Sequence, residues 1–99
     1  MKRHVNTNIH PGIILKADVI LPSGLSISQA AELLQISRVT LSKIVNGTGA
    51  ITPNIALRIE SVFGGKADLW LRMQRGYDLI REKVRFESNP PKIKRFTLM

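Results

Sequence analysis

The sequence contains no cysteine, which excludes disulfide bonds, thiolate zinc sites and cysteine nucleophiles. Aromatic residues are also scarce, at 5% of the chain against 43% for all hydrophobic residues, so we expect an aliphatic core of the kind that suits helices. No apolar run approaches the ~20 residues of a membrane-spanning helix, and residues 1–9 show no apolar signal-peptide core. The 99 residues are therefore expected to form one cytoplasmic domain with no membrane partner.

Acidic residues are few relative to basic ones, with seven Asp and Glu against fifteen Lys and Arg and a net charge of +8. The excess lies at the two ends of the chain. Residues 1–16 carry three bases and no acid, residues 17–71 are neutral, and residues 72–99 carry eight bases and three acids. Such a charge attracts polyanions such as nucleic acid or an anionic surface, although solvated charges that keep a small protein soluble give the same composition.

Hydrophobic periodicity and helix-capping residues divide the chain into five helical segments, and there is no internal repeat. The capping signals are Pro11 at a first helical position, a Ser26–Gln29 capping box, and Ser37 and Thr52 as N-caps. The expected helices cover residues 11–21, 26–34, 37–46, 52–63 and 67 to about 85. The inner face of the first helix is expected to comprise Ile13, Ile14, Ala17, Ile20 and Leu21.

The expected fold is all-α, with an N-terminal arm (residues 1–9), a five-helix domain (residues 10–86) and a short basic C-terminal tail (residues 87–99). Asn89, Pro90 and Pro91 should end the last helix. The tail is expected to be extended, and the alternation of apolar and basic residues after Pro91 also fits a weak strand.

The second and third segments, with the short turn between them, fit a helix-turn-helix. Gln35 occupies the turn position that usually carries glycine, because the backbone there often needs a positive φ, at a cost of roughly 1 kcal/mol for other residues. Small or apolar residues lie where the two helices must pack together: Ala30, Ala31, Leu34, Ile36, Leu41 and Ile44. The opposite side of the third segment is then the face that a recognition helix presents to the major groove.

The residues on that outward face have the chemistry of base recognition. Arg38 and Lys43 can donate hydrogen bonds to the O6 and N7 acceptors of guanine. Ser42 can bond several base edges, and the methyl groups of Val39 can lie on a thymine methyl. The hydroxyl groups and free amides at the start of the segment suit phosphates, which fix the register without reading sequence. The predicted DNA-binding residues are Ser37, Arg38, Val39, Thr40, Ser42, Lys43 and Asn46.

The last segment carries a narrow apolar stripe with the 3, 4, 3, 4 spacing of a short coiled coil. A stripe of this kind on an arginine-rich helix has to be covered, which predicts a dimer interface. Trp70 also fits a position in the domain's own core, and Gly76 either lets a partner helix approach or weakens its own helix. The predicted interface residues are Trp70, Met73, Tyr77, Ile80 and Val84.

The sequence offers no convincing catalytic or metal site. His4 and His10 lie six residues apart without a third ligand, and no two carboxylates are paired for acid–base chemistry. We therefore expect no metal, no cofactor and no enzymatic activity.

The run from Leu25 to Gly47 resembles the lambda-repressor-like (XRE) helix-turn-helix family. Further short signatures on either side of this run are similar to HigA/VapI-type antitoxins, and the resemblance covers about residues 8–83. These signatures are His10-Pro11-Gly12, Ile51-Thr52-Pro53 with Ala56-Leu57-Arg58, and Phe63-Gly64-Gly65 with Trp70-Leu71, Gln74 and Tyr77-Asp78-Leu79. Two positions depart from the pattern: Ile27 stands where the wider class often has a glutamine that touches the DNA backbone, and Lys66 replaces the serine expected to cap the last helix.

The resemblance implies a lambda-repressor-like domain that forms a homodimer, binds a palindromic operator in double-stranded DNA and represses its own promoter. It also implies a neighbouring gene for a HigB-type toxin, a RelE-like ribonuclease that cuts messenger RNA on the ribosome. The antitoxin of such a pair neutralises the toxin by binding it and is not an enzyme.

Two other interpretations of the sequence compete with this one. A stand-alone helix-turn-helix regulator without a toxin is favoured by the charge of +8, which is more basic than an antitoxin needs if it must bind a basic ribonuclease. A small nuclease or an RNA-binding module is disfavoured, because the sequence lacks clustered carboxylates, clustered histidines and stacking aromatics.

Overall fold

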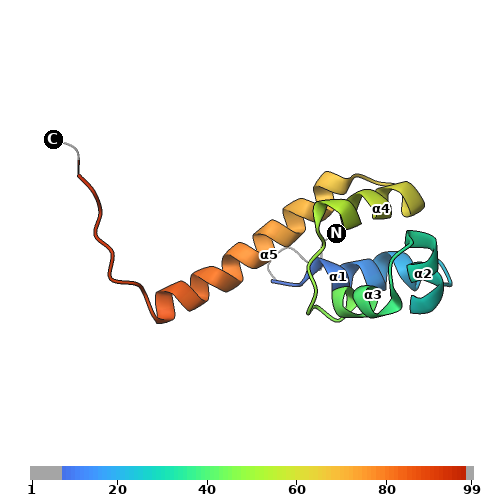
Figure 1. Cartoon of the computed structure of the whole chain (residues 1–99), viewed down its shortest axis with the longest axis horizontal. Coiled ribbons are helices and arrows are strands. Elements are labelled where there is room, and N and C mark those ends of the chain that lie inside the picture. Colours follow the sequence, from blue (N-terminus) through green and yellow to red (C-terminus); the bar gives the residue numbers. More distant parts are fainter. Residues whose placement is uncertain (1–7, 98–99) are drawn as a thin grey trace.

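The computed structural model describes residues 8–97, and within that range the regular structure is entirely helical (Figure 1). The expectation of an all-α, five-helix domain is confirmed. Residues 1–7 of the predicted arm, including His4, lie outside the described residues, as do Leu98 and Met99. The elements are α1 (Pro11–Leu15) continued by the π-helical turn η2 (Lys16–Ile20), then α2 (Ile27–Leu34), α3 (Arg38–Val45), α4 (Pro53–Phe63) and α5 (Ala67–Ser88).

The first helix departs from the regular α-helix that its periodicity predicts. In η2 the Leu21 amide donates to the Lys16 carbonyl over 3.0 Å, a five-residue step that widens the turn. Leu15 and Ile20 consequently lie in the core with 0% exposure. Ile13 and Leu21, which we expected to face inward, are 44% and 56% exposed. A periodicity of 3.6 residues cannot anticipate this change of register.

Most helix starts lie where the capping residues predict them. The Ser26 hydroxyl accepts from the Gln29 amide over 3.1 Å, and the Ser26 amide donates to the Gln29 side chain over 2.9 Å, which completes the capping box. α5 begins at Ala67 although Lys66 provides no side-chain cap. A Glu60 carboxylate oxygen accepts from the Ala67 amide over 2.8 Å, so α4 supplies the missing cap.

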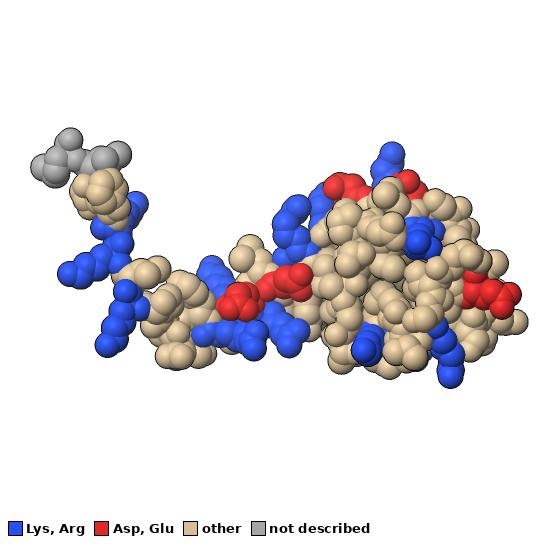
Figure 2. Space-filling model, viewed as in Figure 1, with Lys and Arg blue, Asp and Glu red and all other residues tan. Residues whose placement is uncertain are grey.

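α5 is the longest helix, and its second half projects from the body of the molecule, which consists of the first four helices and the first half of α5 (Figures 1 and 2). The molecule measures 58 × 26 × 24 Å, and every residue from 78 to 97 is exposed. The helix continues past the expected end near Arg85 as far as Ser88, so residues 87 and 88 are helical. It stops there because Pro90 disfavours a helical conformation at Asn89. Residues 89–97 form no strand.

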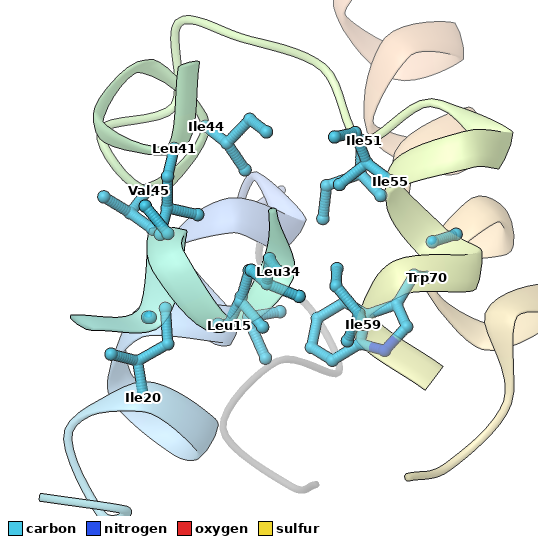
Figure 3. Packing of buried hydrophobic residues seen from close by; sticks show 14 of the residues in the cluster. Leu15, Ile20, Leu34, Leu41, Ile44, Val45, Ile51, Ile55, Ile59 and Trp70 are labelled. Atoms are coloured by element: carbon cyan, nitrogen blue, oxygen red, sulfur yellow. The ribbon is translucent and has the colours of Figure 1, made fainter. Parts of the chain in front are cut away.

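The core is aliphatic and receives side chains from all five helices, with one aromatic at its edge. Figure 3 shows Leu15 of α1 and Leu34 of α2 pointing towards Ile59 of α4 and Trp70 of α5. α3 packs against both α1 and α2, while α4 contacts α2 and α5. The core therefore holds α3 from its inner side and leaves its other side open.

Candidate nucleic-acid interface

The helix-turn-helix packs as the spacing of its small and apolar residues predicts. Gln35 ends α2 in the left-handed region with φ 57° and ψ 43°, as expected for its place in the turn. Five of the six expected packing residues are buried, and Ile36 is half-buried against the core: Ala30, Ala31, Leu34, Ile36, Leu41 and Ile44. The outer side of α3 is consequently turned away from the core.

The structure gathers the predicted base-reading residues on this outer side. Four of them line one surface hollow of about 360 Å³: Arg38, Val39, Ser42 and Lys43. Val39 is 65% exposed although it is apolar, so its methyl groups are available to a ligand. Ser42 is half-buried, whereas Ser37, Thr40 and Asn46 are exposed.

The hydroxyl groups of α3 differ in what they leave free for a ligand. The Ser37 hydroxyl caps the helix, because it accepts from the Thr40 amide over 3.0 Å and donates to the Thr40 hydroxyl over 2.8 Å. The Thr40 hydroxyl acts as an acceptor in that bond, so its own proton can be donated outward. The Ser42 hydroxyl likewise accepts from the Asn46 amide group over 3.4 Å and can donate to a base edge.

Arg58 of α4 fixes the turn that orients α3, a role that the sequence did not reveal. Its Nη1 donates to the carbonyls of Leu34 and Gln35, each over 2.9 Å, and its Nε donates to Asn54 over 2.7 Å. The two carbonyls lie at the end of α2, where no later turn of helix satisfies them. Arg58 belongs to one of the signature motifs, but sequence spacing does not show which backbone groups it reaches.

The first turn of α1 lies directly on the backbone of α3. A Cβ atom at Gly12 would stand 1.7 Å from the Ile44 carbonyl oxygen, so only glycine allows this approach. His10 caps α1, with its Nδ1 accepting from the Gly12 amide over 2.9 Å. The same imidazole meets the Tyr77 ring edge-on at a centroid distance of 5.0 Å, which connects α1 to α5. Burial lowers the pKa of His10.

Gln74 ties α5 to the loop that follows α3. The side chain is buried, its Oε1 accepts from the Ile51 amide over 2.9 Å, and its Nε2 donates to Asp78 over 3.0 Å. The polarity of Gln74 gave no indication of its burial, because its partner lies 23 positions away in sequence. α5 is thus tied to the loop between α3 and α4, directly before the N-cap of α4.

The structure divides the apolar stripe of α5 into two parts. Trp70 is only 6% exposed and belongs to the core of the monomer, and Met73 is half-buried against that core. Tyr77 is half-buried beside His10. Ile80 and Val84 are 51% and 60% exposed on the projecting half, so they are the members of the stripe that lie open to a partner.

Two kinds of feature are absent from residues 8–97. No three His, Asp or Glu side chains in this range gather where they could hold a metal ion. No helix in this range is both long and apolar enough to cross a membrane.

Comparisons with known proteins agree with this geometry. Residues 17–70 match the helix-turn-helix family model. Virulence-associated protein A of Dichelobacter nodosus is 41% identical over 91 residues, covering 91% of this chain and 89% of that protein. Virulence-associated protein I of the same organism is 44% identical over 71 residues, covering 72% and 66%.

Solved structures extend the likeness to nearly the whole chain. The structure described as Pseudomonas aeruginosa antitoxin HigA with higBA promoter superposes with a TM-score of 0.82 at 25% identity. The matched region covers 92% of this chain and 100% of that one. This protein therefore belongs to the XRE-type helix-turn-helix family, in which its relatives include the HigA antitoxins and virulence-associated protein I.

Proposed function

We propose that this protein is a DNA-binding antitoxin that recognises an operator through the outer side of α3 and represses its own promoter. The observation that carries the proposal is the hollow formed by Arg38, Val39, Ser42 and Lys43 on a helix whose inner side is packed. A relative of the same fold was solved with its promoter, which supports DNA as the ligand.

In this proposal the side chains of α3 contact different groups of the DNA. Arg38 and Lys43 donate to guanine acceptors, Ser42 donates to a base edge, and Val39 contacts a thymine methyl. Thr40 and the amides at the start of α3 bind phosphate, while Asn46 supports Ser42. Ser37 acts mainly through the cap that positions these groups.

A homodimer would place two copies of α3 in successive major grooves, about 34 Å apart, and so match a palindromic operator. We place its interface along Ile80 and Val84, which are exposed on the projecting half of α5. Met73 and Tyr77 lie between this contact and the body, and Trp70, which belongs to the core of the monomer, is not part of the interface.

We infer that the partner protein is a HigB/RelE-like toxin that cleaves messenger RNA. The likeness to an antitoxin named HigA supports this inference. In this function the chain acts by binding DNA and toxin and catalyses no reaction. The inference is tested by expressing the small reading frame beside this gene with and without this chain, and growth arrest that the chain fails to relieve would overturn it.

The second candidate function is that of a stand-alone regulator, and the net charge of +8 favours it. An acidic or neutral surface suits the capture of a basic ribonuclease better than a basic one does. An adjacent reading frame for a small basic RelE-like protein favours the antitoxin, and its absence favours the regulator.

The first test is a mobility-shift titration on the duplex upstream of the chain's own coding sequence, with single base pairs substituted in turn. Arg38→Ala should relax the preference at one operator position by about 1–3 kcal/mol. Lys66→Ala is a matched control, because Lys66 is exposed between α4 and α5 rather than on α3. An unchanged preference in Arg38→Ala would contradict the assignment of the face.

A further inference from the structure

The projecting end of α5 and the segment after it form a basic extension, residues 79–97. It holds six bases against two acids: Arg81, Lys83, Arg85, Lys92, Lys94 and Arg95 against Glu82 and Glu87. Figure 2 shows Lys and Arg side chains gathered along this part of the molecule. Among the described residues, Lys92, Lys94 and Arg95 have no carboxylate partner, and all three are exposed.

The basic extension begins beside the C-terminal end of the recognition helix. Tyr77, just before it, meets the ring of His10 at 5.0 Å. His10 in turn lies against the loop after α3, because a Cβ at Gly47 would lie 3.6 Å from the His10 Cβ. Gly47 closely follows α3, so the extension leaves the body next to the helix that we propose to read DNA.

The length of the extension suits the DNA that flanks the sequence read by α3. Its helical part, ten residues at about 1.5 Å each, spans about 15 Å, and residues 89–97 reach at most about 30 Å. Duplex DNA presents about one phosphate charge per 1.7 Å of its axis. A duplex that continues from α3 alongside the extension would present phosphate charges over its whole reach.

We propose that the basic extension binds the phosphates of the flanking duplex as a second, sequence-independent DNA site. This inference rests on the proposed function, because it places the DNA at α3. The occupant is argued from charge, since unpaired exposed cations release counterions from a polyanion. The contact adds affinity and salt dependence and leaves base preference unchanged.

The test compares the wild type with the triple variant Lys92→Gln/Lys94→Gln/Arg95→Gln. Affinity is measured against salt concentration on the upstream duplex and on a duplex of the same composition in scrambled order. Each lost phosphate contact should make the slope of log K against log salt less steep by about 0.9, so three contacts change it by about 2.7 on both duplexes. The preference for the upstream duplex should be retained.

The matched control Lys66→Gln/Arg72→Gln/Arg75→Gln removes the same charge from the start of α5, which lies over the body. Its slope should change much less, and an equal change would show a general effect of net charge and overturn the proposal. An unchanged slope in the triple variant would also overturn it. A shift in sedimentation with an unchanged slope would instead assign the extension to contact with a second copy.

The two proposals fail in different ways in this experiment. If the wild type binds both duplexes equally, the proposal that α3 reads sequence is overturned. The difference in salt slope between the wild type and the triple variant still tests the extension. If the wild type prefers the upstream duplex and the triple variant has the same salt slope as the wild type, only the proposal about the extension is overturned. Circular dichroism checks that the triple variant folds, which is expected because the three residues are fully outside the core.

Discussion

Single polar side chains connect helix ends and loops at points that the hydrophobic core does not reach. Arg58, Gln74 and His10 each satisfy backbone groups at the end of a helix or in a loop. Arg58 bonds the turn between α2 and α3, Gln74 bonds the loop directly before α4, and His10 bonds the start of α1. Leaving a buried polar group unpaired costs about 1–3 kcal/mol, so the buried bonds of His10 and Gln74 contribute to stability. The partly buried bond of Arg58 to Leu34 holds the turn before α3.

The contribution of Arg58 can be measured directly. Arg58→Ala should lower the free energy of unfolding by about 1–3 kcal/mol, because the carbonyls of Leu34 and Gln35 lose their donor. Urea titration provides the measurement. Arg72→Ala removes an exposed ion pair in which Arg72 Nε lies 3.1 Å from Asp68 Oδ2. It should lower the free energy of unfolding by less than about 0.5 kcal/mol. Equal losses in the two variants would contradict the role of Arg58.

His10 should make the stability of the protein depend on pH. Burial is the main cause that lowers its pKa from the usual value of about 6.5, while nearby Asp78 and a hydrogen bond to the Gly49 backbone raise it and Arg81 lowers it. The neutral imidazole accepts from the Gly12 amide, so its stabilising effect is complete above pH 6.5. This stabilisation decreases as the pH falls below 6.5 towards the lowered pKa of His10, and the free energy of unfolding then falls by at most about 1.4 kcal/mol per pH unit.

The measurement is the urea midpoint between pH 8 and pH 5 for the wild type and for His10→Asn. Asparagine keeps an acceptor at the N-cap and removes the titration. The wild type should lose more stability than His10→Asn as the solution is acidified. Parallel pH profiles would show that protonation of His10 is not linked to folding.

At the scale of the elements, close approach between helices decides which residues are allowed. α1 reaches the backbone of α3 at Gly12, where a methyl group has no room. Gly76 lies in α5, and a Cβ atom there would have nothing within 4 Å, so this glycine is not needed for packing inside the monomer. The packing of the monomer therefore requires glycine at position 12 and does not require it at position 76.

The pair of substitutions Gly12→Ala and Gly76→Ala tests this distinction. Gly12→Ala should destabilise the fold by about 3 kcal/mol or more, because a backbone atom rather than a flexible side chain blocks the methyl group. Gly76→Ala should stabilise α5 by about 1 kcal/mol. Thermal unfolding of both variants measures the effects. A loss of self-association in Gly76→Ala would show instead that a partner helix approaches there.

At the scale of the whole molecule, a packed body carries one long helix that extends beyond it. The body holds α3 with its outer side free, and the projecting half of α5 exposes Ile80 and Val84. The same helix also exposes Leu79, at 66%, which does not belong to the stripe. The outer side of α3 therefore lies on the body, whereas the exposed part of the apolar stripe lies on the projecting half of α5.

The dimer proposed along this stripe is tested with Ile80→Asp/Val84→Asp. Unpaired carboxylates in an apolar contact should raise the dissociation constant by about 100-fold, equivalent to about 2.8 kcal/mol. Leu79→Asp is the control and should leave it unchanged. Sedimentation equilibrium measures the constant, and operator affinity should fall with it. A double variant that still forms the wild-type dimer would place the interface elsewhere.

Residue patterns along the chain were sufficient to predict the local structure: the capping box at Ser26, the left-handed turn at Gln35 and the division of α2 and α3 into inner and outer sides. These features depend on residues within a few positions of one another, whose chemistry is visible in the chain. The π-helical turn, the Arg58 contacts and the Glu60 cap of α5 became visible only once the helices were packed together. The same holds for the burial of Trp70 and the exposure of Ile80 and Val84. Each of these depends on which element lies opposite another in space, because burial and long-range hydrogen bonds are satisfied by neighbours that sequence spacing does not identify.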